Sequence, residues 1–288
     1  MNYLALRRQG LLRNLKAGGR PSDAILVTHP ANVTYLTGFT GDSSYLVLTA
    51  KTAVLVTDTR FEEQAREDCP ELGKDDGLDL HVRKHDATTT EAAAGVLAKT
   101  GAKAVAVEAN RLTVAELEAL QGLVPKAEFV PVAGPVEALR VSKDPGEVEK
   151  IKAAIRVAER AFKMFVATMA ETDTEKEMVD SLELYVRRCG AKGTSFPPIV
   201  AVGERGALPH APPTNQPLSE GSKLLVDWGA DWSATRTARC CSAGTRPSGP
   251  STTWRRCTPP SSPPRTRPSP PCGTGSRRRT WTRPPASR

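Results

Sequence analysis

The last fifth of the chain lacks the residues from which a protein core is built. Of its 288 residues, the 56 from Ser233 to Arg288 include no Asp, Glu or Lys, and no Val, Ile, Leu, Met, Phe or Tyr. They do include 12 Arg, 11 Pro and 4 Cys. A segment of this composition buries too little apolar surface to offset the entropy lost on folding. We therefore expect residues 233–288 to form a disordered, Arg/Pro/Ser/Thr-rich tail.

The positive net charge of the chain comes from this tail. The whole sequence has 40 Lys and Arg against 32 Asp and Glu, a formal charge of +8, and the tail holds 12 of the basic residues. Residues 1–232 are left with 28 basic and 32 acidic residues, a net charge of −4. A basic total favours an anionic partner such as a nucleic acid, but the body of this chain does not share that charge.

Long apolar runs and paired cysteines are also missing. No stretch approaches the ~18 apolar residues of a membrane span, and the N-terminus lacks the apolar run of a secretory signal. We expect a cytoplasmic protein without membrane contact. Before residue 233 the cysteines are Cys69 and Cys189, whose separation in sequence offers neither a disulfide framework nor a zinc-ligand spacing.

Before residue 140 the hydrophobic pattern alternates between strands and helices. It predicts helices over 3–16, 91–100 and 113–123, and strands over 24–28, 45–49, 52–57 and 102–107, two of them in a hairpin. Thr113 is a plausible N-cap, because Glu116 completes a capping box with it. Such alternation predicts an α/β domain over residues 1–140.

Turn residues at 142–146 precede a second domain, which we place at residues 145–232. A long helix is expected from Glu147 to Met169, because apolar residues recur there at spacings of three and four. A second helix is expected over 174–189, entered through the polar residues 172–175 and ended by Gly190. Strands are expected over 199–202 and 223–227. The predicted order is therefore helix, helix, strand, strand.

Two polar residues of this second domain are candidates for chemistry. Asp227 ends the apolar strand and is followed by an expected turn, and a carboxylate held there suits a metal ligand or a general base. Its alternative role is to cap that turn. His210 lies in the Pro-rich segment Leu208–Pro213, where it is either a solvated side chain or a catalytic one.

In combination these segments resemble the proline-peptidase and creatinase family of pita-bread metallopeptidases, which includes Xaa-Pro aminopeptidases and prolidases (Xaa-Pro dipeptidases). The resemblance lies in Asp23–Val27, Asn32–Gly41, Thr57–Ala65, Arg140–Ala158 and Ser195–Ala230. It implies a creatinase-like N-terminal α/β domain followed by a pita-bread α+β catalytic domain, truncated near residue 232.

The resemblance also implies a chemistry. Members of the family hold two divalent metal ions, manganese, cobalt or zinc, between two Asp, one His and two Glu, and a bridging water attacks the scissile carbonyl. By resemblance, Asp227 is the first metal ligand and His210 binds the substrate carbonyl or the tetrahedral intermediate. The expected substrates are peptides with proline at the second position, and the expected assembly is a homodimer.

The resemblance ends where the remaining ligands should follow. The second metal-binding Asp of the family falls at Ala238, eleven residues after Asp227. Asp231 is the last acidic residue and His210 the last histidine, so the downstream His and both Glu have no counterpart. One carboxylate cannot hold two metal ions, because each ion needs several oxygen or nitrogen ligands. We expect this chain to bind no metal pair and to be inactive as a peptidase.

Three other functions stay open at this point. A creatinase-type amidinohydrolase shares the fold without needing the metals. A non-catalytic pseudo-enzyme could serve as a dimerisation module. The Arg-rich tail could bind nucleic acid, with Trp254 and Trp281 stacking on bases, but its arginines are scattered and Lys is absent, so nucleic acid is the weakest of these alternatives.

The composition of the tail is that of a shifted reading frame. All its residues are Ala, Cys, Gly, Pro, Arg, Ser, Thr or Trp, the amino acids whose codons have G or C in the middle position. A GC-rich gene has G or C at most third codon positions, and a frameshift can move these to the middle. We predict that sequencing the locus will reveal another frame encoding the missing Asp, His and Glu ligands. A locus without such a frame would refute this origin.

Overall fold

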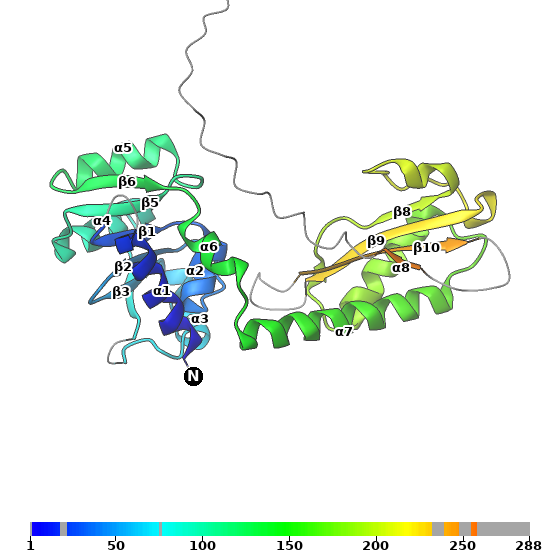
Figure 1. Cartoon of the computed structure of the whole chain (residues 1–288), viewed down its shortest axis with the longest axis horizontal. Helices are drawn as coiled ribbons and strands as arrows, with labels where there is room; N and C mark the ends of the chain where they lie inside the picture. Colours follow the sequence, from blue (N-terminus) through cyan, green and yellow to red (C-terminus); the bar gives the residue numbers. More distant parts are fainter. Residues whose placement is uncertain (1, 18–21, 75–76, 232–238, 248–254, 258–288) are drawn as a thin grey trace, which may run out of the picture.

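The computed structural model describes residues 2–17, 22–74, 77–231, 239–247 and 255–257. Two sheets, each with its own helices, lie side by side in Figure 1, and the long helix α7 (Pro145–Thr168) leads from the first to the second. Among these residues, every helix is too short or too polar to cross a lipid bilayer.

The first sheet has six strands in the order β4-β3-β2-β1-β5-β6. They are β1 (Ala24–Val27), β2 (Tyr45–Thr49), β3 (Ala53–Thr57), β4 (Asp79–Val82), β5 (Ala104–Glu108) and β6 (Glu128–Val132). β2 is antiparallel to β1 and to β3, whereas β1–β5, β5–β6 and β3–β4 are parallel. The predicted hairpin is thus β2–β3, and the α/β class is confirmed.

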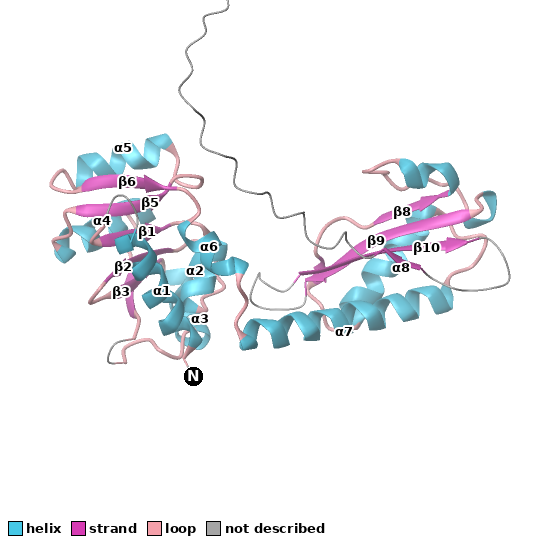
Figure 2. Cartoon of the chain, viewed as in Figure 1, coloured by secondary structure: helices cyan, strands magenta, loops and turns pink. Residues whose placement is uncertain are grey.

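Helices cover both faces of this sheet, as Figure 2 shows. They are α1 (Tyr3–Ala17), α2 (Pro30–Thr37), α3 (Glu62–Asp68), α4 (Thr89–Thr100), α5 (Val114–Leu123) and α6 (Pro135–Val141). The central strand β1 explains the arrangement: Ile25 and Val27 pack with Leu11 and Leu36 on one face, while Ala24 and Leu26 belong to the core on the other. Successive strand residues point to opposite faces, so a strand apolar at every position needs cover on both.

Capping boxes begin four of the helices, and the one at Thr113 confirms the N-cap predicted from the sequence. Thr113 accepts a hydrogen bond from the backbone N–H of Glu116, and the Glu116 carboxylate accepts one from the backbone N–H of Thr113. Thr88, Asp144 and Thr174 begin α4, α7 and α8 (Glu175–Arg188) in the same way. Reciprocal bonds of this kind satisfy N–H groups that have no partner within the helix.

The second sheet is built around β9 (Lys223–Asp231). β7 (Gly193–Thr194) and β8 (Ile199–Val202) pair with β9 in antiparallel fashion. On the other edge of β9 lie β10 (Arg239–Pro247) and then β11 (Arg255–Cys257), also antiparallel. Helices α7 and α8 cover one face, where the Trp228 ring stacks on Phe162 with 4.0 Å between ring centroids.

Two strands of this sheet lie in the segment predicted to be disordered. All nine residues of β10 are paired with β9, and β11 is paired with β10. Strand pairing uses backbone N–H and C=O groups, which every residue but proline supplies, so an open edge of β9 accepts a sequence without core-forming side chains. The prediction of disorder is therefore wrong for these two strands. The rest of residues 233–288 lies outside the described residues, and disorder there stays a prediction.

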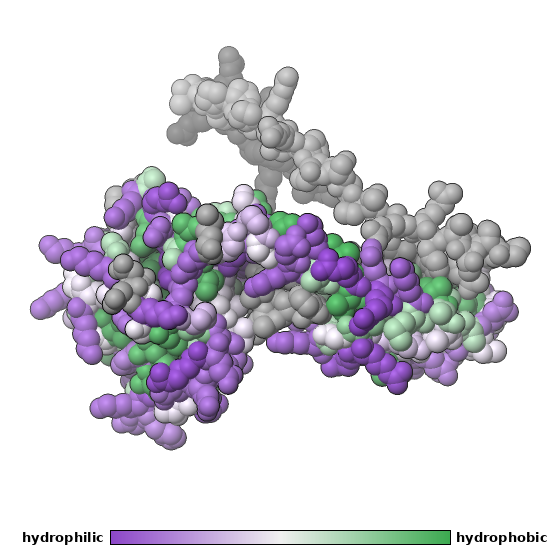
Figure 3. Space-filling view, turned by 90° about the horizontal axis from the view of Figure 1, so that it is seen from below, coloured by the Kyte–Doolittle hydropathy of each residue, from purple (hydrophilic) through white to green (hydrophobic). Residues whose placement is uncertain are grey.

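The surface seen in Figure 3 is mainly hydrophilic, with apolar residues in separate groups. Large apolar side chains that are exposed include Leu184 on α8 and Leu208 in the loop after β8. The molecule thus keeps most of its apolar side chains in the cores of its two parts.

Helix α8 offers a matched test of how its inner face stabilises the second part. Leu182 is fully buried against β8 and β9, whereas Leu184 on the same helix is 46% exposed. Replacing Leu182 by Ala leaves a cavity, so we expect the free energy of unfolding to fall by about 2–5 kcal/mol in urea denaturation. Leu184→Ala should change it by less than about 0.5 kcal/mol. Equal effects of the two substitutions would contradict this packing.

Candidate functional site

Asp227 lies in the middle of β9 and not at the end of a strand. The strand continues to Asp231, because Gly229 and Ala230 are buried and pair with β10. The expected turn after Asp227 is therefore wrong, and so is the turn-capping role. Glycine is common in turns, but here Gly229 and the small Ala230 are buried within a central strand.

The side chain of Asp227 faces away from α7 and α8. Val226 and Trp228, its neighbours along β9, belong to the core beneath those helices. Alternation along the strand places Asp227 on the opposite face, beside Ile199, its partner on β8. Asp227 is half-buried there. The carboxylate is thus fixed by a rigid strand on the face that these helices leave uncovered.

Burial raises the pKa of Asp227 above its ordinary value, and no partner among the described residues opposes this effect. A buried carboxylate usually has an ion pair or several hydrogen bonds, because losing hydration without them is costly. Carboxylates kept without such partners concentrate at functional sites. The environment of Asp227 therefore fits a group that acts on a ligand better than one that stabilises the fold.

His210 is exposed and lies in a loop that follows β8. This loop, residues 206–213, begins within the short helix η2 (Gly203–Ala207) and is called here the His210 loop. A Cβ atom on Gly206 would lie 3.3 Å from Cβ of Leu225, which shares the face of β9 with Asp227. The loop therefore starts over the same face as Asp227. No hydrogen bond joins His210 to Asp227 or to another described residue.

Sequence reasoning missed a buried carboxylate that holds this loop. Glu175, the first residue of α8, is fully buried and accepts hydrogen bonds from Val202, Arg205 and Thr214. Burial alone would raise its pKa, but these hydrogen bonds outweigh burial and lower the pKa below the ordinary value. In the sequence, Glu175 is an acidic residue directly after the N-cap Thr174. Acidic residues are common in the first turn of any helix, so this position did not indicate an anchor.

An open hollow of about 700 Å³ lies beside the base of this loop. Its lining residues are Val202, Gly203, Glu204, Arg205, Gln216, Glu220, Gly221, Ser222 and Lys223. Neither Asp227 nor His210 is among them. The hollow is therefore a separate feature at the N-terminal end of β9.

The residues present do not fit a two-metal site. Within the described parts of the chain, no three His, Cys, Asp or Glu side chains cluster as metal ligands would. Beyond Asp231 the sequence has no Asp, Glu or His at all. Asp227 could supply one oxygen ligand, but a divalent ion needs several.

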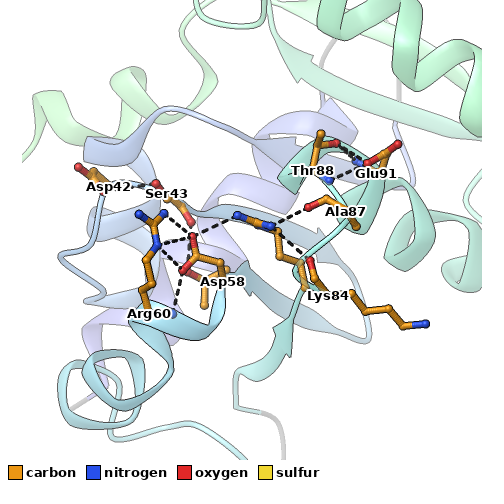
Figure 4. A network of polar contacts seen from close by, with 10 residues as sticks. Asp42, Ser43, Asp58, Arg60, Lys84, Ala87, Thr88 and Glu91 are labelled. Atoms are coloured by element: carbon orange, nitrogen blue, oxygen red, sulfur yellow. Dashed lines mark hydrogen bonds and ion pairs between the residues drawn. The ribbon is translucent and has the colours of Figure 1, made fainter.

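A second polar network, shown in Figure 4, lies in the first part of the molecule. Asp58 is nearly buried after β3 and forms ion pairs with Arg60 at 2.7 Å and Arg83 at 3.4 Å. The hydrogen bond from the Arg60 side chain is the main cause that lowers the pKa of Asp58. Arg83 also donates to the carbonyl of Ala87 at 2.7 Å. These contacts join the end of β3 to the segment that leads into α4, so we assign the network a structural role.

Comparison with known families divides the chain at the same place as the two sheets. Residues 7–142 match the Creatinase/Prolidase N-terminal domain, and residues 149–254 match Metallopeptidase family M24. The second match continues past residue 232, where the resemblance seen in the sequence ended, and includes β10.

Individual proteins similar to this chain are also named as peptidases. The uncharacterised peptidase YqhT of Bacillus subtilis is 32% identical over 76% of this chain and 60% of its own length. The solved X-Pro aminopeptidase of Thermotoga maritima is 29% identical with a TM-score of 0.70, over 81% of this chain and 64% of that one. The solved Xaa-Pro dipeptidase of Bacillus anthracis is 26% identical with a TM-score of 0.74, over 86% of this chain and 66% of that one. The chain thus spans less than two thirds of the length of these relatives.

The lone carboxylate gives a prediction about stability. Because burial raises the pKa of Asp227, its ionised form destabilises the fold at pH values above that pKa. We expect Asp227→Asn to stabilise the protein at pH 7, by less than about 1 kcal/mol because solvent screens a half-buried group. The gain should shrink as the pH falls toward about 3.9, the ordinary pKa of Asp.

Thermal melts at pH 7 and pH 4 would measure this effect. Asp231→Asn, at the end of the same strand, is the matched control for removing one negative charge. A loss of stability in Asp227→Asn at pH 7 would show that the ionised carboxylate has a stabilising partner.

Proposed function

Because this chain joins a creatinase/prolidase N-terminal domain to a metallopeptidase family M24 domain, we propose that it descends from Xaa-Pro aminopeptidases or dipeptidases. Such enzymes hydrolyse the peptide bond that precedes proline. The single observation that carries the proposal is the setting of Asp227 within the M24 match, half-buried on a central strand and without a partner among the described residues. The names of the two solved relatives support the substrate class.

The substrate would be a peptide with proline at the second position. The nitrogen of a bond to proline carries no hydrogen, so an enzyme for this bond cannot use that N–H as a donor. In this proposal His210 binds the substrate carbonyl or stabilises the negative charge that develops on its oxygen. An exposed imidazole on a loop over the face of Asp227 is accessible to a peptide. A homodimer and a cytoplasmic location remain part of the proposal.

We further propose that the chain with this sequence has lost the reaction. Asp227 is the one residue that corresponds to a metal ligand, and Ala238 stands where the second Asp is expected. The two ions, whether manganese, cobalt or zinc, would activate water and polarise the carbonyl in an intact relative. With one ligand left, the residues of this chain offer no binding site for them. The shifted reading frame explains this loss and the unusual tail together.

Activity assays on two matched proteins test the proposal. We expect the chain as given to show no cleavage of an Xaa-Pro dipeptide with manganese, and no stoichiometric manganese binding in calorimetry. A version with the reading frame restored from residue 233 should cleave the same substrate. In that version, Asp227→Asn should lower the rate by more than about a hundredfold, because a lost ligand costs more than a lost second-layer contact.

The outcomes separate the alternatives. Cleavage by the chain as given would refute the loss of activity. A restored form inactive on Xaa-Pro peptides but active on creatine would replace the peptidase proposal by the amidinohydrolase. Inactivity on both substrates would favour the non-catalytic module.

A further inference from the structure

The His210 loop is anchored at both ends by one buried carboxylate, that of Glu175. We propose that Glu175 is a positioning residue, which holds the loop so that the His210 side chain stands over the sheet face that carries Asp227. The inference rests on the proposed role of His210. Glu175 itself touches neither His210 nor Asp227, so it acts through the loop.

The hydrogen bonds of Glu175 reach both sides of the loop. Its Oε1 accepts from the backbone N–H of Val202, the last residue of β8, at 2.8 Å. Its Oε2 accepts from the backbone N–H of Thr214 at 2.8 Å and from the Thr214 hydroxyl at 2.7 Å. Val202 precedes the loop and Thr214 follows it directly. One carboxylate therefore closes a ring of backbone that contains His210.

Arg205 completes this ring. Its Nε donates to the two carboxylate oxygens of Glu175 at 3.1 and 3.2 Å. Its Nη2 donates to the carbonyl of Pro212 at 2.5 Å, across the loop. The guanidinium thus neutralises the buried charge and spans the loop from one side to the other. Hydrogen bonds that involve charged partners are stronger than neutral ones, so this ring is held firmly.

The start of helix α8 is joined to the same segment by its backbone. The N–H of Glu175 donates to the carbonyl of Gln216 at 3.1 Å, and that of Lys176 to the carbonyl of Thr214 at 3.2 Å. These are N–H groups of the first helical turn, which have no partner within the helix. The segment after His210 is therefore tied to a rigid helix as well as to β8.

Glu175 is not needed as a helix cap. Thr174 and Glu177 form the capping box of α8 at the surface, where no charge has to be buried. Glu175, in contrast, is 0% exposed, and burying a carboxylate is costly unless its lone pairs are filled. Here they are filled by residues that border the His210 loop. Glu175 therefore serves the loop, whereas Thr174 and Glu177 stabilise the start of the helix.

An anchored loop changes what His210 can do. Its backbone lies five residues after Arg205 and four before Thr214, so both ends of a short connection are fixed. A group that binds a substrate oxygen works best when its position is set before the substrate arrives. Without the anchor, the same imidazole would sample many positions over the sheet.

Glu175→Gln tests the proposal in the chain as given. Glutamine has the same shape but one acceptor oxygen, so it cannot serve both Val202 and Thr214. We expect the protection of these two amides against hydrogen exchange to fall about tenfold or more. The NMR order parameter of the His210 amide should drop from about 0.85 to below about 0.6. Glu177→Gln, in the same helical turn, should leave both quantities unchanged.

Leu182→Ala separates positioning from plain destabilisation. It should lower the thermal midpoint while the order parameter of His210 stays as in the unmodified chain. If Glu175→Gln does not fold, Thr214→Val decides, because it removes one hydroxyl donor and keeps the backbone bond. An ordered His210 in the folded variant, or an equal loss of order in Glu177→Gln or Leu182→Ala, would overturn the proposal.

The measurements of hydrogen exchange and of the His210 order parameter are independent of the peptidase assay. If the restored form fails to cleave Xaa-Pro substrates, the proposed function falls and the measured anchoring of the loop stands. If His210 keeps its order without Glu175, the positioning role falls whatever the assay shows.

Discussion

The second half of the molecule depends on one strand, β9, whose backbone is paired along both edges. β7 and β8 occupy one edge and β10 the other. One face of β9 provides Val226, Trp228 and Ala230 to the core beneath α7 and α8. The opposite face carries Asp227. Because the strand is fixed on three sides, Asp227 is held rigidly although its carboxylate has no described partner.

Two carboxylates of this half have opposite environments: Glu175, which is fully buried, and Asp227, which is half-buried. Glu175 is surrounded by donors, and its pKa is lowered, because the hydrogen bonds outweigh the effect of burial. No described residue donates to Asp227, and burial raises its pKa. The carboxylate of Glu175 stabilises the His210 loop through its hydrogen bonds to Val202 and Thr214. The carboxylate of Asp227 has no hydrogen-bond or ion-pair partner among the described residues. The contrast follows from the neighbours of each residue and not from residue type.

Strong periodicity allowed most helices and strands to be predicted, and weak periodicity hid the rest. The capping box at Thr113 located the start of α5 closely. Helix α2 was missed because seven of its eight residues are buried and polar residues such as Asn32 and Thr34 are among them, so its pattern does not separate a buried face from an exposed one. The predicted end of β9 was wrong because Gly229 is a residue type typical of turns, although here pairing with β10 keeps it in the strand. Glu175 could not be recognised as an anchor, since Val202 and Thr214 are far from it in sequence.

The sequence by itself determined the α/β class, the family resemblance and the absence of Asp, Glu and His beyond residue 231, because these depend on local pattern and on which residues are present. Tertiary structure decided that Glu175 is surrounded by donors, while Asp227 has none among the described residues. It also decided that β10 pairs with β9 despite its composition, since backbone groups alone make that pairing. Burial and hydrogen bonding join residues that are distant along the chain, and those distances are set only by the fold.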